Sequence, residues 1–246
     1  MKYKMTLEYD GTGFSGWQSQ KTVANTVQNI LQQALKTALR VEVALEGSGR
    51  TDAGVHALGQ VAHFKVDKEI NTFTLMGSIN ALVRPNPVCV RAIERVADDF
   101  HARFSAKQRT YLYRIQNSYY PPILKHNRVW WTGGQPLDVQ KMNQAAQLLI
   151  GKHDFSTFRA ADCQAHSPIK TIDGIVVFET ADEIQMRISA KSFLYHQVRN
   201  IMGSLVNVGN GKWQVSDFEA ALKACDRTKG GVTAPAAGLY FEQVIY

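Results

Sequence analysis

The chain has 246 residues, and its 28 Lys and Arg against 21 Asp and Glu give a formal net charge of +7. Hydrophobic residues make up 45 %, which excludes a disordered chain and allows one large domain or two ordinary ones. The basic surplus favours a polyanionic partner but leaves nucleic-acid binding and mere solubility about equally open.

The first half of the chain reads as alternating strands and helices. Residues 2–9 alternate polar and apolar side chains, which predicts a half-buried strand. Helical periodicity over 27–39 follows, with Asn25 or Thr26 as the cap and a polar segment, Trp17 to Ala24, before it. Further strands are predicted over 41–45, 62–66, 88–92 and 109–115, with a helix near 73–80. This order resembles the split βαβ, ferredoxin-like arrangement found in RRM domains.

The second half begins after turn signals between Pro121 and Pro136. Asp138 can cap a helix that runs to about Leu149, and strands are predicted over 171–178, 184–190 and 239–246. A helix is expected over 194–206, and Ser216 with Glu219 has the spacing of a capping box. We therefore expect an α+β protein of two related lobes, residues 1–118 and 119–246, with mixed, mainly antiparallel sheets.

The motifs of the common cofactor and metal enzymes are weak or missing. Gly11 to Gly16 forms a G-x-G-x-x-G string, but no helix opens at these glycines and no acidic residue follows at the ribose distance. The sequence has no HExxH pair, and His56 and His63 lack a carboxylate at ligand spacing. The three cysteines form no CxxC pair. We expect neither a cofactor nor a metal.

No apolar run reaches the roughly 20 residues that span a membrane, and the N-terminal segment lacks the apolar run of a signal peptide. We therefore expect a cytoplasmic protein with free thiols and no membrane partner.

Three glycines lie within the eight residues from Gly47 to Gly54, and they surround one carboxylate, Asp52. Glycines allow backbone turns that other residues resist, so Asp52 could be presented to a substrate on this loop. An aspartate in a tight turn that accepts local backbone hydrogen bonds is the structural alternative. The loop alone does not decide between the two.

The loop from Gly47 to Ala57 resembles the signature of the TruA family of tRNA pseudouridine synthases. The resemblance spans nearly the whole chain through several long strings in the same order, Tyr9–Gln18, Phe100–Phe104, Arg109–Tyr113, Asp154–Phe158, Phe193–Gly203 and Thr233–Leu239. It implies a pseudouridine synthase fold with a central cleft. It also implies an isomerase that converts uridine to pseudouridine in the anticodon stem-loop of tRNA, at positions 38, 39 and 40.

The resemblance assigns roles to individual residues. Asp52 matches the family's nucleophile, and whether it would attack C1′ of the sugar or C6 of the base stays open. Arg199 matches the basic partner that keeps the nucleophile ionised, while Arg50 would fill the space of a flipped base or hold a phosphate. Tyr111 matches the stacking residue for the flipped uridine, with a hydroxyl that could move a proton, and Leu239 matches the apolar wall of the pocket.

Basic residues are concentrated around the strand of Tyr111, and they could neutralise tRNA phosphates. Lys107 and Arg109 are the expected substrate contacts, and the wider set adds Arg91, Arg95, Arg103, Arg114, Lys125 and Arg128. The resemblance further implies a homodimer. A tRNA-binding protein without the reaction is the alternative, although its expected sheet lacks the RNP1 string of an RRM domain.

Overall fold

The structure is a computed structural model that describes residues 1–19 and 25–246, so residues 20–24 of the expected polar segment lie outside the described residues. The chain divides into two compact units, the first comprising Met1–Lys107 with Tyr240–Tyr246 and the second Gln108–Leu239. This division differs from the expected boundary after residue 118. The strand of Tyr111 pairs along its length with a strand of the second unit, and the last seven residues return to the first.

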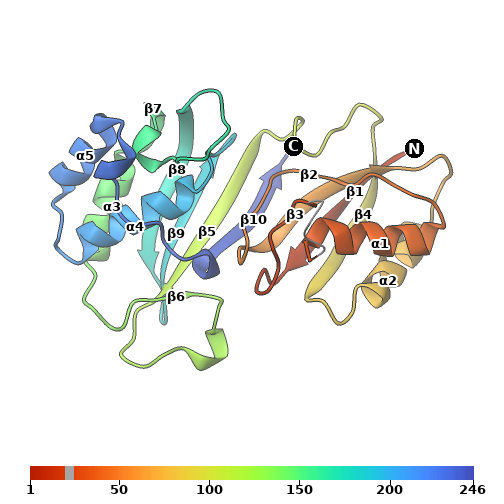
Figure 1. Ribbon diagram of the computed structural model, residues 1–246, viewed down its shortest axis with the longest axis horizontal. Coiled ribbons are helices and arrows are strands. Elements are labelled where there is room, and N and C mark those ends of the chain that lie inside the picture. Colours follow the sequence, from red (N-terminus) through yellow and green to blue (C-terminus); the bar gives the residue numbers. More distant parts are fainter. Residues whose placement is uncertain (20–24) are drawn as a thin grey trace. The chain divides into compact units, whose positions relative to one another are not determined.

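The first unit is built on a mostly antiparallel sheet (Figure 1). Its strands are β1 (Lys2–Tyr9), β2 (Glu46–Gly47), β3 (His56–Lys65), β4 (Val88–Val96) and β10 (Leu239–Ile245), and its helices are α1 (Val27–Leu39) and α2 (Thr72–Leu82). β1 lies between β3 and β4, and β3 also pairs antiparallel with β2 and parallel with β10. The order β4-β1-β3-β2, with a helix after β1 and another after β3, confirms the predicted split βαβ unit.

The second unit has a comparable order of elements (Figure 1). β5 (Gln108–Gln116), β9 (Ile184–Ala190), β8 (Ile169–Glu179) and β7 (Gly151–Asp154) form an antiparallel sheet, and the short β6 (Trp130–Trp131) pairs with β5. The helices are α3 (Val139–Gln147), α4 (Gln197–Gly209) and α5 (Val215–Ala224), and α3 packs on β8. β9 lies between β5 and β8 as β3 lies between β1 and β2, so the prediction of two related α+β lobes is confirmed.

Local capping accounts for several helix ends. Thr26 rather than Asn25 caps α1, and its hydroxyl accepts a hydrogen bond from Asn29 N–H. Asp138 caps α3 as predicted. The capping box of α5 pairs Gln214 with Asp217, two residues before the predicted pair of Ser216 and Glu219. α4 begins at Gln197, later than predicted.

One predicted strand is wrong. Residues 41–45 form no strand, although Val43 and Leu45 are buried as a strand's inner face would be. Two glutamines of α1 donate to backbone carbonyls that a neighbouring β-strand would otherwise bind. Gln28 Nε2 lies 2.7 Å from Leu45 O, and Gln32 Nε2 lies 3.4 Å from Val43 O. Side chains of the helix thus replace a neighbouring strand as partners of this extended segment.

Among the helices that the structure describes, none combines the length and the apolar character needed to cross a membrane.

Candidate active site

The loop of Asp52 lies between β2 and β3, at the end of β3 where β10 also pairs. The carbonyl of Asp52 accepts a hydrogen bond from Val55 N–H at 3.1 Å, which closes a tight turn. Gly54, the third residue of that turn, has a φ of +78°, as a type II turn requires. The Asp52 side chain is half-buried, so the turn holds a carboxylate that solvent still reaches.

The segment from Gly11 to Trp17 contacts the Asp52 loop through its backbone. Trp17 N–H donates to Thr51 O at 3.0 Å. A Cβ on Gly11 would lie 2.0 Å from Val55 O, and a Cβ on Gly16, whose φ is +91°, would lie 2.6 Å from Thr51 O. Two of the three glycines that mimic a dinucleotide motif, Gly11 and Gly16, are therefore needed because the backbone of the Asp52 loop passes directly against them.

Two buried polar residues that bond to the loop, Tyr9 and Gln60, were not among the site residues predicted from the sequence. The hydroxyl of Tyr9 lies 2.8 Å from Thr51 Oγ1, and burial raises the pKa of Tyr9 to about 12. Gln60 is fully buried and bonded to the loop backbone. The available signals were a tyrosine at a core position, which needs a partner for its hydroxyl, and an amide beside the predicted strand over 62–66.

Two of the expected residues of the second unit, Arg199 and Leu239, are found at its segment 234–239. Arg199, on the first turn of α4, donates from Nε to Ala234 O at 2.7 Å. The hydroxyl of Tyr113 donates to Pro235 O at 2.7 Å. Burial raises the pKa of Tyr113 well above its usual value, an effect that the charge of Arg199 partly offsets. Leu239 ends this segment and is 5 % exposed.

Tyr111 is half-buried on β5, where it pairs with Ile188 of β9. Its ring meets Phe193 edge to face, with centroids 5.1 Å apart. This contact orients the Tyr111 ring without using its hydroxyl.

The candidate residues therefore fall into two groups. Asp52, Arg50 and Lys107 belong to the first unit, whereas Tyr111, Arg199, Leu239 and Arg109 belong to the second. Arg50 is exposed, and its Nε donates to Gln18 Oε1 at 3.2 Å. The side chain of Lys107 is exposed, as a phosphate contact requires.

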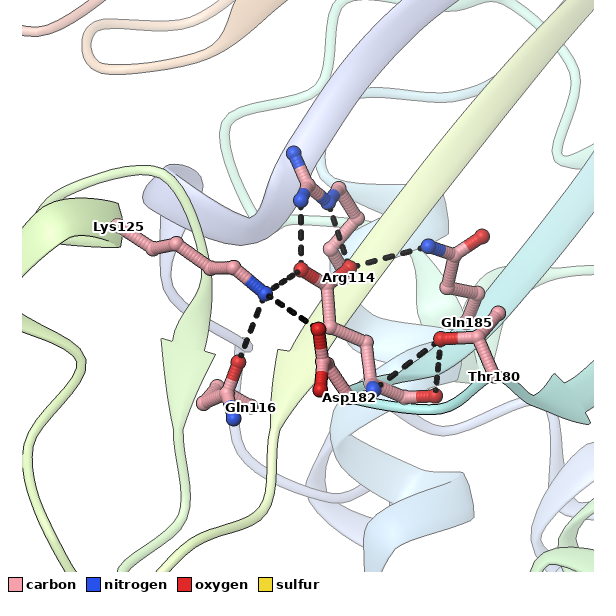
Figure 2. A network of polar contacts seen from close by, with 7 residues as sticks. Arg114, Gln116, Lys125, Thr180, Asp182 and Gln185 are labelled. Carbon is pink, nitrogen blue, oxygen red and sulfur yellow. Dashed lines mark hydrogen bonds and ion pairs between the residues drawn. The ribbon is translucent and has the colours of Figure 1, made fainter.

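Several of the basic residues expected to contact phosphates have other partners. Arg109 is 8 % exposed and its guanidinium donates to Lys191 O, so burial removes it from the set of phosphate contacts. Arg114 and Lys125 both bind the buried carboxylate of Glu183, at 2.6 and 2.8 Å (Figure 2). Burial opposes ionisation of Glu183, but hydrogen bonds from Arg114, Lys125 and Gln185 outweigh it and lower its pKa to about 2. Both cations are thus paired with an acidic group within the protein.

Glu46, His63 and His101 lie close enough to suggest a metal site, with ligand atoms within 4.8 Å of one another. The sequence did not indicate this cluster, because its members are far apart in the chain. However, Nδ1 of His63 accepts from Ala102 N–H at 3.3 Å, and Nδ1 of His101 accepts from Arg103 N–H at 3.1 Å. Each neutral ring therefore carries its proton on Nε2, which is then unable to bind a metal. Burial and the neighbouring His101 also lower the pKa of His63.

A family model described as tRNA pseudouridine synthase matches residues 5–105 and 145–246. A protein of Xanthobacter autotrophicus called tRNA pseudouridine synthase A is 52 % identical over 245 residues, 100 % of this chain and 99 % of that protein. One of the same name from Rhodospirillum rubrum is 49 % identical over 244 residues, 99 % of this chain and 87 % of that protein.

A solved structure, that of a Cbf5-Nop10-Gar1 complex, aligns with a TM-score of 0.35 and 11 % identity over 83 % of this chain and 45 % of that chain, a likeness too weak to carry an argument. The family model matches most of this chain, and the two relatives match 99 % and 100 % of it at 49 % and 52 % identity. The chain belongs to the tRNA pseudouridine synthase family, whose members are isomerases acting on tRNA.

Proposed function

We propose that this enzyme converts uridine to pseudouridine in the anticodon stem-loop of tRNA, at positions 38, 39 and 40, with Asp52 as the nucleophile. The observation that carries the proposal is the Asp52 loop. Its backbone is fixed by the hydrogen bond from Trp17 N–H to Thr51 O and by close packing against Gly11 and Gly16. A loop held this firmly presents one half-buried carboxylate in a defined place, which nucleophilic catalysis requires.

The reaction needs neither a redox partner nor water. The bond between N1 of the uracil and C1′ of the ribose breaks, and a bond between C5 and C1′ forms. C5 loses its hydrogen as a proton and N1 gains one, so the product is an isomer of the substrate. A carboxylate can form a covalent adduct that separates bond breaking from bond making, whether it attacks C1′ or C6.

Three residues of the second unit, together with Arg50 of the first, would supply the remaining roles. A base stacked in a helical stem is out of reach, so the target uridine must be flipped out. The ring of Tyr111, already oriented by Phe193, is suited to stack on the flipped base. The guanidinium of Arg199 would keep Asp52 ionised, and Leu239 would form an apolar wall. Arg50 would occupy the space that the flipped base leaves or hold a phosphate.

Binding of the tRNA would rest on exposed basic side chains. Lys107 has the required exposure, as have Arg91, Arg95 and Arg103 of the first unit and Arg128 of the second. Such contacts neutralise phosphates and position the RNA without reading its sequence. We further propose that the enzyme acts in the cytoplasm as a homodimer.

The substitution Asp52→Asn tests the nucleophile, because it removes the charge and keeps the shape of the side chain. Release of tritium from C5 of the target uridine should fall to an undetectable level. Binding of tRNA should remain within about tenfold, roughly 1.4 kcal/mol. Asp67→Asn, an exposed aspartate of the same unit, is the matched control and should keep full activity. A folded Asp52→Asn protein with substantial tritium release would refute the role of Asp52. If the protein only binds tRNA, neither the wild type nor any variant would release tritium.

A further inference from the structure

We propose that Gln60 is a positioning residue of this enzyme, whose side-chain amide holds the backbone before Asp52 in its reactive place. The inference rests on the proposed role of Asp52. It follows from the hydrogen bonds of one buried amide that joins β3, β1 and the Asp52 loop.

The Gln60 side chain is fully buried, and both ends of its amide are engaged. Oε1 accepts from Ser48 Oγ at 2.6 Å and from Val61 N–H at 3.2 Å. Nε2 donates to Gly49 O at 2.9 Å, and a side-chain hydrogen bond joins Gln60 to the hydroxyl of Tyr9. Because Val61 N–H can only donate and Gly49 O can only accept, the backbone determines which end of the amide faces which partner.

These bonds act on the residues that immediately precede Asp52. Gln60 holds the side chain of Ser48 and the carbonyl of Gly49, and Tyr9 extends the network to the hydroxyl of Thr51. The carbonyl of Thr51 is held separately by Trp17 N–H. The backbone is thus tied at two carbonyls on the approach to Asp52, one by a backbone N–H and the other by the Gln60 side chain.

The same amide is too deep to touch RNA, since none of its surface is exposed. Its effect on the reaction must therefore pass through the position of the loop. A displacement of about 1 Å at a reacting group can reduce turnover by about 10²-fold. By contrast, RNA binding by phosphate contacts elsewhere should not respond to such a shift.

The first test replaces Gln60 by Met, which has a similar length but none of the four hydrogen bonds. We expect kcat to fall about 10²-fold, with Kd for tRNA within about threefold of wild type. Asn80→Ala is the matched control. Asn80 exchanges two hydrogen bonds with Val90 at 2.8 and 2.9 Å, which tie α2 to β4 away from the loop. That variant should lose comparable stability and keep its kcat.

The second test replaces Gln60 by Glu and keeps the proposal falsifiable should the Met variant not fold. A protonated carboxyl can still donate to Gly49 O, whereas an ionised one cannot. Burial raises the pKa of such a carboxyl, so kcat should be near the wild-type value in mild acid and fall as the pH rises. Tyr9, the titratable group bonded to Gln60, has a pKa of about 12 and stays neutral throughout this range.

A wild-type kcat in a folded Gln60→Met protein, or a Gln60→Glu pH profile that parallels wild type, would overturn the role of Gln60. If either result is found together with an inactive Asp52→Asn protein, the proposed function is retained and only the role of Gln60 is rejected. Full activity of Asp52→Asn would instead refute the proposed function itself.

Discussion

Replacing Glu183 by Gln should destabilise the second unit in a pH-dependent way. The Glu183 side chain is 3 % exposed and accepts hydrogen bonds from Arg114, Lys125 and Gln185 (Figure 2). These bonds outweigh the effect of burial and take its pKa from 4.5 to about 2. At about 1.4 kcal/mol for each pH unit, the charged form contributes about 3 kcal/mol to the free energy of unfolding at pH 7.

The sign follows from the lowered pKa. The folded state binds the proton less readily than the unfolded state, so the contribution is complete above about pH 4.5 and is lost as the pH falls towards 2. The difference in unfolding free energy between wild type and Glu183→Gln should therefore shrink from about 3 kcal/mol at pH 7 to about 1.4 kcal/mol at pH 3. Carboxylates common to both proteins cancel in this difference.

Urea unfolding followed by tryptophan fluorescence measures this quantity in the relevant unit, because Trp130, Trp131 and Trp213 all belong to it. Asp182→Asn is the control within the same network. Its side chain is 76 % exposed and its carboxylate is 4.0 Å from Lys125, so its loss should cost under about 1 kcal/mol. A difference between wild type and Glu183→Gln that is constant from pH 7 to pH 3 would refute the reasoning, as would equal effects of the two substitutions.

Two further predictions concern the reaction and the binding of RNA. Tyr111→Phe keeps the ring but removes the hydroxyl, and single-turnover assays should show a loss of about 10²-fold if the hydroxyl moves a proton. Full activity of Tyr111→Phe would limit the residue to stacking, and full activity of Tyr111→Ala would remove it from the site. Lys107→Ala should make the dependence of log K for tRNA on log salt shallower by about 0.7 to 0.9 for each phosphate that the lysine neutralises. Lys125→Ala should leave that slope unchanged, because its ammonium group is bonded to Glu183, and equal slopes for both variants would contradict this assignment.

The sequence predicted those parts of the fold that depend on local periodicity. Residues 2–9 alternate because one face of β1 is buried, and the observed burial follows that alternation. The cap at Asp138 was also visible, since the side chain bonds three residues ahead. The prediction of a strand over 41–45 was wrong because buried alternate residues indicate an extended chain but do not reveal what pairs with it.

The parts of the site that could not be predicted depend on contacts between distant residues. Glu183 follows an aspartate near a turn and reads as a solvated residue, yet the fold brings it to Arg114, 69 residues earlier, and to Lys125, 58 residues earlier. Gln60 gave only the signal of an amide within a strand. The loop of Asp52 was recognisable from its glycines and its resemblance to a family, but its support by Gly11 and Gly16 required the structure.

The return of β10 to the first unit has a consequence for synthesis of the protein on the ribosome. β10 pairs with the start of β3 at His56 and Ala57, and the ring of Tyr240 stacks on His56 with centroids 4.7 Å apart. Both contacts lie directly after the Asp52 loop, yet Tyr240 is translated 188 residues after Asp52. A nascent chain can therefore assemble β1, β3 and β4 early. It cannot cover His56 until residues 108–239 have been made, so this contact beside the Asp52 loop forms only after the second unit has been translated.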